Sequence, residues 1–331
     1  MPTSDIHPII VPTPFLVGPV NAYLLDGPEP ALIDAGPNTP EAMSALREGL
    51  AAHGRALSDI RHLVITHSHP DHFGMAARIV AESGARVYSH RYNVDRLATG
   101  RPDGDQPDGR MSQLFEESDV PAGIIAGMYK DFDTSASYTQ PLALDVVLED
   151  GDALRLGERN WTVLHTPGHA RGHACLFDSA SRTLLSGDHL IRDISSNPIV
   201  EPPLPGETER PHTLAQYIGS LRRTAEMDIA VALPGHGPAI TEVRPLIAQR
   251  LRFHRKRADA IAAILAKKPS TVYEIVQAHF PPMRGMGAFL AVSEVIGHLD
   301  VLEEEGRVRS ERVDGLRVYA PADGSIAQWS R

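Results

Sequence analysis

A run of ligand-type side chains directly behind an apolar segment constrains this chain more than any other feature of its sequence. In LVITHSHPDHFG, residues 63–74, three imidazoles and a carboxylate fall within a few positions: His67, His69, Asp71 and His72. The apolar residues before them predict a buried strand, and the polar residues follow its carboxyl end. Imidazole and carboxylate without thiolate suit zinc, iron or manganese at a catalytic site. We therefore predict that a metal site begins at the end of this strand.

Other short β-type runs also end in polar residues. PALIDAG ends near Asp34, WTVLHTPGH at His169, TLLSGD at Asp188 and IAVALPGHG near His236. Helical patterns alternate with these runs over about residues 40–53, 73–83 and 212–226, which predicts an α/β architecture. In such folds, sites form where strand ends converge. The glycines beside these ligands allow sharp turns and positive φ, so that each ligand can point inward: Gly168, Gly187, Gly235 and Gly237.

Two segments interrupt this alternation. ATGRPDGDQPDGR, residues 98–110, leads into two short helical patterns, and we predict a helical insertion over about residues 98–140. The Pro-rich SSNPIVEPPLPGETERP follows Asp188. Long segments of this kind are functional lids or disordered. The apolar and aromatic residues of the insertion either contact substrate, as we predict, or pack its own small core: Met111, Phe115, Ile125, Met128 and Tyr129.

The C-terminal part predicts a separate small domain. A basic helical pattern is followed by STVYEIVQAHF, which starts with a Thr271/Glu274 capping-box spacing, and by a third helix stopped by Gly306. Two alternating strands around an Asp-Gly turn end the pattern. This is the order of a winged-helix unit, so we predict a catalytic domain over 1–244 and a winged-helix-like domain over 245–331. The third helix is acidic and would repel phosphate, which favours a packing or lid-forming role.

Charge and composition limit the classes of partner and the cellular location that we expect for the chain. The net charge of the 331-residue chain is −10, which disfavours nucleic acid without excluding it. The single cysteine, Cys175, rules out a disulfide framework and is expected to be a core residue. Because we find no apolar run of about 18 residues, we expect no membrane span. The N-terminal residues lack the pattern of a secretory signal, so we expect a cytoplasmic protein.

The ordered set of strand-end residues resembles that of the metallo-β-lactamase-fold hydrolases. That family carries H-x-H-x-D-H, matched here by HSHPDH, and then a histidine, an aspartate and a final histidine, matched by His169, Asp188 and His236. The early family aspartate matches Asp34. Over about residues 10–240, the resemblance implies a four-layer αββα sandwich with the metals at one edge.

The resemblance also implies roles for these residues. His67, His69 and His169 would hold one metal, Asp71, His72 and His236 a second, and Asp188 would bridge the two; zinc is favoured, with iron or manganese as alternatives. Asp71 is the expected catalytic residue, because it would also orient the nucleophile. Asp34 would orient a ligand. His173 and His189 are candidates for proton donation or for supporting the ligands, and a structural role is an equal alternative for both.

These features predict a binuclear metal hydrolase whose metal-bridging hydroxide attacks a small ester or thioester. The sequence resembles both the glyoxalase II branch and, in its C-terminal part, the β-lactamase-like protein 2 group. Four alternatives stay open. They are an endoribonuclease, a lactonase or β-lactamase side activity, a non-catalytic metal-binding module, and an iron oxygenase similar to the persulfide dioxygenases. The last would use only His67, His169 and Asp188. A homodimer also stays open.

Overall fold

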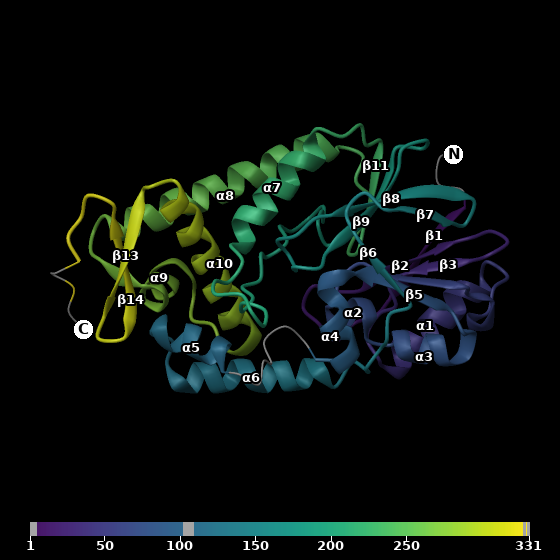
Figure 1. Ribbon diagram of the computed structural model, residues 1–331, viewed down its shortest axis with the longest axis horizontal. Coiled ribbons are helices and arrows are strands. Elements are labelled where there is room, and N and C mark those ends of the chain that lie inside the picture. Colours follow the sequence, from purple (N-terminus) through teal and green to yellow (C-terminus); the bar gives the residue numbers. More distant parts are fainter. Residues whose placement is uncertain (1–4, 102–108, 327–328, 330–331) are drawn as a thin grey trace. The chain divides into compact units, whose positions relative to one another are not determined.

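The computed structural model describes residues 5–101, 109–326 and 329 of the chain (Figure 1). These residues form two compact units, each assembled from three segments. Unit 1 consists of Met1–Asp103, Thr134–Ser196 and Ser220–Ile247, and unit 2 consists of Gly104–Asp133, Asn197–Gly219 and Ala248–Arg331. Residues 102–108 of the predicted insertion lie outside the described residues. Residues 109–133 of the insertion and residues 197–211 of the Pro-rich segment belong to unit 2, whereas residues 98–101 and 134–140 belong to unit 1. The predicted domain boundary at 244/245 stays a prediction.

Unit 1 contains two mixed β-sheets. The first has six strands in sequence order: β1 (Ile6–Val11), β2 (Val20–Leu25), β3 (Ala31–Ile33), β4 (His62–Ile65), β5 (Arg86–His90) and β6 (Val146–Leu148). Its strands β3 to β6 run parallel. The second has the order β11 (Val231–Pro234), β10 (Thr183–Gly187), β9 (Ala174–Asp178), β8 (Arg159–His165) and β7 (Ala153–Leu156). Here only β10 and β11 pair in parallel.

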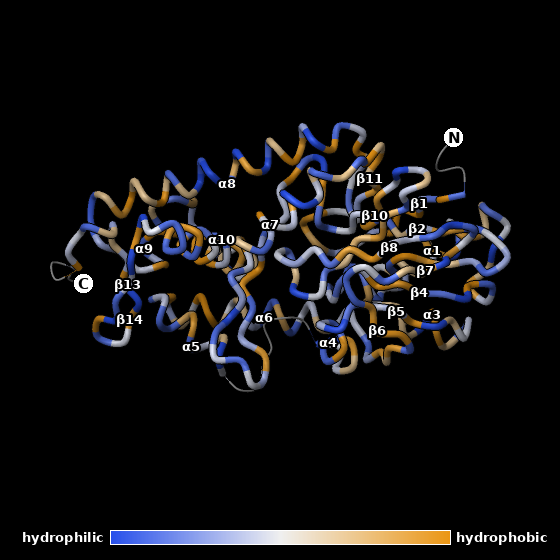
Figure 2. The backbone as a smooth tube through the Cα atoms, turned by 45° about the horizontal axis from the view of Figure 1, so that its top comes forward, coloured by the Kyte–Doolittle hydropathy of each residue, from blue (hydrophilic) through white to orange (hydrophobic). Residues whose placement is uncertain are grey.

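The two sheets bury apolar residues against each other. Side chains of both sheets share one core, among them Ile33, Val64, Trp161, Val163 and Leu185. Alternate residues of the first sheet face the other way, where they pack with helices α1 (Pro40–Ala51) and α3 (Ala76–Ser83). Figure 2 shows hydrophobic segments running along these strands. The predicted strand ends and the four-layer α/β fold are confirmed.

Shorter elements complete unit 1. They are η1 (Leu57–Asp59), α2 (Pro70–Phe73), η2 (Arg91–Asn93) and α4 (Val94–Thr99). The helix predicted over 73–83 is α3, which begins only at Ala76 because the chain turns at residues 74–75 between α2 and α3. A Cβ on Gly74 would fall 2.2 Å from the Tyr138 carbonyl oxygen, so only glycine fits this close approach.

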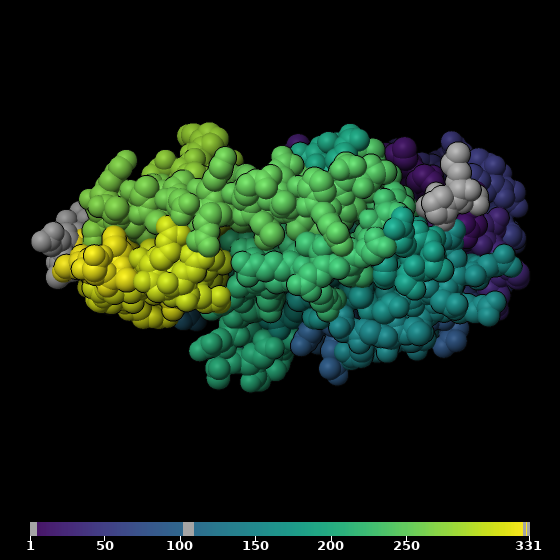
Figure 3. All heavy atoms as spheres, turned by 90° about the horizontal axis from the view of Figure 1, so that it is seen from above, coloured from purple at the N-terminus to yellow at the C-terminus, as the bar shows by residue number. Residues whose placement is uncertain are grey.

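Unit 2 is mainly helical. Its elements include α5 (Arg110–Glu117), α9 (Val272–His279) and α10 (Gly285–Glu304), with a sheet of order β12 (Ser270–Thr271), β14 (Leu316–Pro321) and β13 (Val308–Val313). Three helices are shared between the segments of the two units: α6 (Ala122–Ala136), α7 (Thr213–Ala225) and α8 (Val243–Leu265). The hairpin β13–β14, yellow in Figure 3, lies at the surface of unit 2.

The local signals of the C-terminal part are confirmed. Thr271 and Glu274 form a capping box, with the Glu274 N–H bonded to Thr271 Oγ1 at 3.2 Å and the Thr271 N–H to Glu274 Oε2 at 2.9 Å. Asp314 and Gly315 both have positive φ, 49° and 84°, as a two-residue hairpin turn requires. The helix, helix, helix, hairpin order is present. Its classification as a winged helix stays a prediction.

The core of unit 2 corrects one group of predicted site residues. Met111, Phe115 and Met128 are at most 1% exposed and pack in the same core as α10, where the Phe115 ring meets Phe289 edge to face. These three are core residues and offer no surface to a substrate. Ile125 and Tyr129 are partly buried against this core. For them the substrate contact, like the lid role of the insertion and the Pro-rich segment, stays a prediction.

Helix α10 corrects another expectation. By length and composition its 20 residues are apolar enough to cross a membrane, contrary to the prediction that no such run exists. However, 72% of its apolar window is buried inside the protein, which is typical of a core helix. Two of its acidic residues, Glu294 and Asp300, are also buried, at 9% and 2% exposure. Part of the negative charge that the sequence places on this helix therefore lies inside unit 2 and not on its surface.

Candidate metal centre

The first ligands are positioned by the junction of β4 and α2. The strand ends before Thr66, and Pro70 begins α2, where proline suits the first helical position. His67 and His69 therefore lie in the connecting loop, and Asp71 and His72 lie on the first turn of the helix.

The remaining ligands follow three other strands, as the sequence predicts. His169 lies in the loop after β8, Asp188 directly follows β10, and His236 follows β11. The neighbouring glycines serve two purposes. Gly168, Gly187 and Gly237 have positive φ, whereas Gly235 leaves room for the ligands, because a Cβ there would fall 2.4 Å from Asp188 Oδ1.

Three imidazoles converge in the first group. His69 Nδ1 lies 2.9 Å from His67 Nε2 and 3.0 Å from His169 Nε2. Two nitrogens bound to one tetrahedral zinc at 2.0–2.1 Å are about 3.3 Å apart, so these contacts are close to the separation that a shared ion requires. The second group contains Asp71, His72 and His236. In it, His236 Nε2 lies 3.3 Å from Asp71 Oδ2.

Asp188 lies between the two groups. Its Oδ2 is 3.5 Å from His169 Nε2 in the first group and 3.6 Å from His236 Nε2 in the second. Its Oδ1 is 3.4 Å from His72 Nε2. The structure thus brings together all seven predicted ligands, with one carboxylate reaching both groups.

Orphaned polar atoms show that this donor set fits a divalent cation. His72 Nε2, His236 Nε2 and Asp188 Oδ1 are buried without hydrogen-bond partners, which costs about 1–3 kcal/mol for each such atom. The other ring nitrogens are held: His72 Nδ1 lies 2.8 Å from Asp34 Oδ2, and His236 Nδ1 lies 2.8 Å from the Pro19 carbonyl oxygen. Fixing one imidazole nitrogen while the other faces inward is typical of metal-binding histidines.

Asp34 connects the ends of neighbouring strands. Its Oδ1 accepts from the Thr66 N–H at 2.8 Å, and its Oδ2 accepts from Thr66 Oγ1 at 2.8 Å as well as contacting His72. Thr66 Oγ1 also lies 3.0 Å from His67 Nδ1. One carboxylate therefore orients a ligand from each group, although Asp34 itself adopts a positive φ of 60°.

His173 and His189 are fully buried and bonded to protein groups. His173 Nε2 accepts from the Asp188 N–H at 3.0 Å, and its Nδ1 lies 2.8 Å from Thr166 Oγ1. His189 Nε2 lies 2.9 Å from Thr224 Oγ1. Because His173 holds the backbone of Asp188, its geometry is that of a positioning residue.

The pKa values of the ligands are shifted in different directions by burial and by neighbouring charges. Burial, followed by the neighbouring imidazoles, holds the pKa of His67 well below its usual range, and burial lowers the pKa of His69 to about 4. Burial also opposes charge on His72, but Asp188, Asp34 and Asp71 raise its pKa well above its usual range. Although burial disfavours its charged form, His236 and His72 hold the pKa of Asp188 well below normal. The carboxylates therefore create a field that favours a cation.

The other buried groups do not extend this site. Cys175 is fully buried, and burial raises the pKa of its thiol to about 12, so it is the expected core residue. A further cluster in unit 2 was not anticipated from the sequence: His254 of α8 with Glu294 and His298 of α10. The only signal was the four-residue spacing of Glu294 and His298, which places both on one helix face.

Comparisons with known proteins agree with this geometry. The family model described as the metallo-beta-lactamase superfamily matches residues 16–236. The probable metallo-hydrolase YqjP of Bacillus subtilis is 39% identical over 311 residues, covering 94% of this chain and 96% of that protein. The crystal structure of a metallo-beta-lactamase family protein from Thermus thermophilus has a TM-score of 0.81 at 29% identity, covering 96% of this chain and 98% of that one.

A third relative carries a more specific name. An acyl-coenzyme A thioesterase of Bos taurus is 33% identical over 174 residues, which cover 51% of this chain and 57% of that protein. Members of the superfamily bind divalent metals through His/Asp clusters of the kind found here. The chain belongs to the metallo-β-lactamase superfamily and is a metallo-hydrolase of that family.

Proposed function

We propose that the chain binds two divalent ions, with zinc favoured, and hydrolyses a small thioester or ester. The observation that carries this proposal is the pair of ligand groups that share Asp188. His67, His69 and His169 would hold one ion, and Asp71, His72 and His236 the other. When bound, such ions supply Lewis-acid polarisation of the substrate carbonyl and lower the pKa of water.

The chain's own residues complete the reaction site. The Asp71 side chain is 11% exposed, and although burial opposes its ionisation, His72 and His236 lower its pKa, so it is a carboxylate at neutral pH. It can therefore accept a hydrogen bond from the attacking water and hold it toward the acyl carbon. Asp34 and His173 position the ligands and the Asp188 backbone without contacting substrate.

Similarity to the acyl-coenzyme A thioesterase supports the thioester substrate. Two alternatives have less support. An iron oxygenase using only His67, His169 and Asp188 would leave the second ligand group without a role. An endoribonuclease is disfavoured by the net charge of −10.

The test is a substrate panel on purified protein whose metal content has been measured. It contains an acyl thioester, a lactone, a cephalosporin reporter and single-stranded RNA. We expect thioester turnover that falls by about 10²- to 10⁴-fold in Asp71→Asn, as for loss of a group acting on the nucleophile. The matched control is Asp228→Asn, because the Asp228 side chain is 75% exposed and forms an ion pair with Arg182 at the surface. RNA cleavage by a protein that leaves thioesters intact would overturn the proposal, as would one iron per chain with oxygen consumption.

A further inference from the structure

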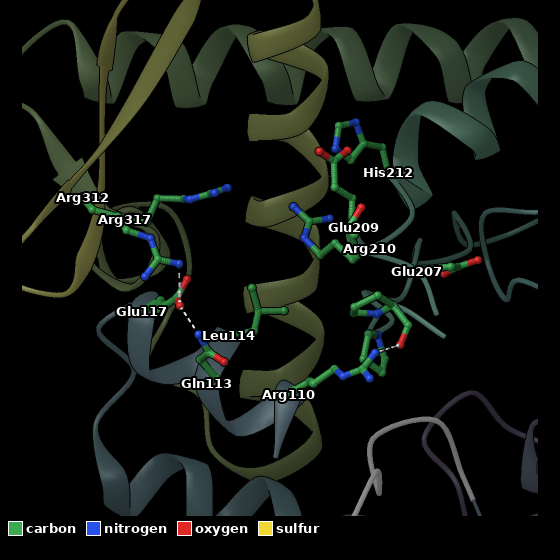
Figure 4. Close-up of a pocket in the computed structure, with 13 residues that line it drawn as sticks. Arg110, Gln113, Leu114, Glu117, Glu207, Glu209, Arg210, His212, Arg312 and Arg317 are labelled. Carbon is green, nitrogen blue, oxygen red and sulfur yellow. Dashed lines mark hydrogen bonds and ion pairs between the residues drawn. The ribbon is translucent and has the colours of Figure 1, made fainter. Parts of the chain in front are cut away.

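Unit 2 contains a cavity of about 640 Å³ that is formed by α5, the segment 202–212 and the β13–β14 hairpin (Figure 4). Ion pairs hold its walls: Arg312 Nη2 lies 2.7 Å from Glu117 Oε1, and Arg210 Nη1 lies 2.8 Å from Asp300 Oδ2. These polar groups connect parts of unit 2 to each other. In unit 1, by contrast, buried polar side chains that are not ligands bind the segments that carry the metal ligands.

Glycines flank His236 in the turn that carries it. The turn has the sequence PGHG, residues 234–237, and Gly237 has a positive φ of 75°. Because glycine allows the backbone more conformations than other residues, a turn with two glycines fixes its side chains poorly on its own. The other two members of the second ligand group, Asp71 and His72, lie on the first turn of helix α2. The direction of His236 therefore depends more on contacts from outside its own segment.

Asn21 of strand β2 contacts three of the four residues of this turn. Its backbone N–H donates to the Gly235 carbonyl oxygen at 2.7 Å, and its Nδ2 donates to the carbonyl oxygens of Pro234 at 2.9 Å and Gly237 at 2.7 Å. Asn21 is buried, at 7% exposure. Since both side-chain contacts are carbonyl oxygens, the amide nitrogen faces the turn. One amide thus connects the backbone before His236 to the backbone after it.

Two further hydrogen bonds reinforce the turn. Tyr23, also on β2, donates its hydroxyl hydrogen to the Pro234 carbonyl oxygen at 2.7 Å. The Gly235 N–H donates to the carbonyl oxygen of Gly187, at the end of β10, at 2.8 Å. The first part of β2, in the first sheet, therefore holds a ligand segment that follows β11, in the second sheet.

A second buried asparagine has the same relation to the first ligand group. Asn93, at the end of η2, donates from Nδ2 to the Gly172 carbonyl oxygen at 2.8 Å, and Gly172 lies three residues after His169 in the same loop. A Cβ on Gly172 would fall 2.1 Å from Asn93 Oδ1, so the loop packs directly on this amide. The loop also closes on itself, through the bond from the Thr166 N–H to the His173 carbonyl oxygen at 2.9 Å.

We propose that Asn21 is a positioning residue for the second ion, whose affinity it sets by holding the His236 turn, and that Asn93 does the same, more weakly, for the first ion through the His169 loop. This inference rests on the proposed two-ion centre. Residues that orient metal-bound histidines typically change the affinity for metal by about 10- to 100-fold. The two asparagines should therefore control the two ions separately.

The test measures zinc binding to the full chain by competition with a chelator and does not depend on enzymatic activity. Asn21→Leu removes the amide donors at nearly the same volume. Tyr23→Phe removes one hydroxyl donor and keeps the ring, so it tests the same turn if Asn21→Leu does not fold. Asn93→Leu is the counterpart, and Asn160→Leu, at an exposed position of β8, is the matched control. Anomalous diffraction at the zinc edge from zinc-loaded crystals shows which ligand group has lost its ion.

We expect Asn21→Leu to weaken the ion of the second group by about 10- to 100-fold and Tyr23→Phe to weaken it less. Asn93→Leu should weaken the ion of the first group instead, and Asn160→Leu should change neither. Two ions held with wild-type affinity in both Asn21→Leu and Tyr23→Phe would overturn this inference and leave the proposed function intact. Equal weakening of both ions by Asn21→Leu would also overturn it, since that result indicates a general loss of structure. A single zinc ion in the wild type would contradict the proposed two-ion centre itself.

Discussion

Unit 1 and unit 2 each contain buried histidines beside a carboxylate, but the charged groups around the two clusters have opposite signs. In unit 1, Asp34, Asp71 and Asp188 surround His72, and together they raise its pKa. In unit 2, His254 Nδ1 lies 3.4 Å from His298 Nε2, a separation that would also suit two ligands of one ion.

Cationic neighbours distinguish the second cluster. Burial first, and then His298, Arg257 and Arg250, lower the pKa of His254 to about 3. Arg257 Nη1 also lies 3.2 Å from Glu294 Oε1. The charges that oppose a proton on His254 oppose a divalent cation as well. Donor type and spacing therefore do not define a metal site on their own, and we interpret the unit 2 cluster as a polar network in the core.

The largest expected effect contrasts the carboxylates of the two clusters. Asp188→Ala removes the group that reaches both ligand groups, so we expect at least a roughly 100-fold loss of thioester turnover and a loss of bound metal. Glu294→Gln should leave the metal content as in the wild type. Metal analysis of dialysed protein with turnover assays measures both. Retention of all metal in Asp188→Ala would show that the shared carboxylate is not a ligand.

Substitution of Asp34 tests whether the residue that orients the metal ligands affects the affinity for metal. Asp34→Ala removes the partner of His72 Nδ1 and of Thr66, so we expect metal affinity to fall about 10- to 100-fold, as for other residues that orient metal-bound histidines. Competition with a chelator measures the affinity, and Asp228→Ala is the control. An unchanged affinity would mean that the loop holds its ligands without Asp34.

The unit 2 cluster should contribute to acid sensitivity. The pKa of His254 is about 3 in the folded protein and near 6.5 when unfolded, so the unfolded chain binds the proton first as the pH falls. This group therefore costs no stability above pH 6.5, and it destabilises the fold progressively between pH 6.5 and about 3. In denaturant unfolding between pH 6.5 and 5, the free energy of unfolding should fall less steeply with decreasing pH in His254→Gln than in the wild type. The difference corresponds to about one proton, or about 1.4 kcal/mol per pH unit.

The smallest expected effect concerns Arg257. Because this guanidinium lowers the pKa of His254, Arg257→Gln should raise it, with the imidazole still neutral at pH 7. Titration of the ring resonances by NMR measures the change. A fall in the pKa of His254, or binding of zinc by the wild-type cluster, would contradict the electrostatic distinction between the clusters.

The metal centre could be predicted from sequence because its signals are local. The ligands lie in the segments that follow strands β4, β8, β10 and β11. Parallel or neighbouring strands bring their ends to one edge of the fold, so His67, His169 and His236 meet although they are far apart in the chain. The capping box at Thr271 and the hairpin turn at Asp314 are local in the same way, and both are present.

Unit 2 could not be predicted equally well, because its packing is not local. The apolar face of the insertion has the same sequence pattern whether it covers a substrate or packs against another helix. The contact between Phe115 and Phe289 is therefore seen only in the structure. For the same reason the partner of Glu294 and His298 could not be identified, since His254 lies on a different helix. The apolar run of α10 is long enough for a membrane span, and its burial in the folded protein shows that it has a core role.

The central claim is that carboxylate-rich surroundings make the unit 1 cluster, and not the unit 2 cluster, a two-ion centre. Anomalous X-ray diffraction at the zinc absorption edge, from crystals of the zinc-loaded protein, tests it most directly. We predict two peaks in unit 1, one at each of the ligand groups that share Asp188, and no peak beside His254 and His298. A single peak in unit 1, or any peak at the His254 cluster, would contradict the account.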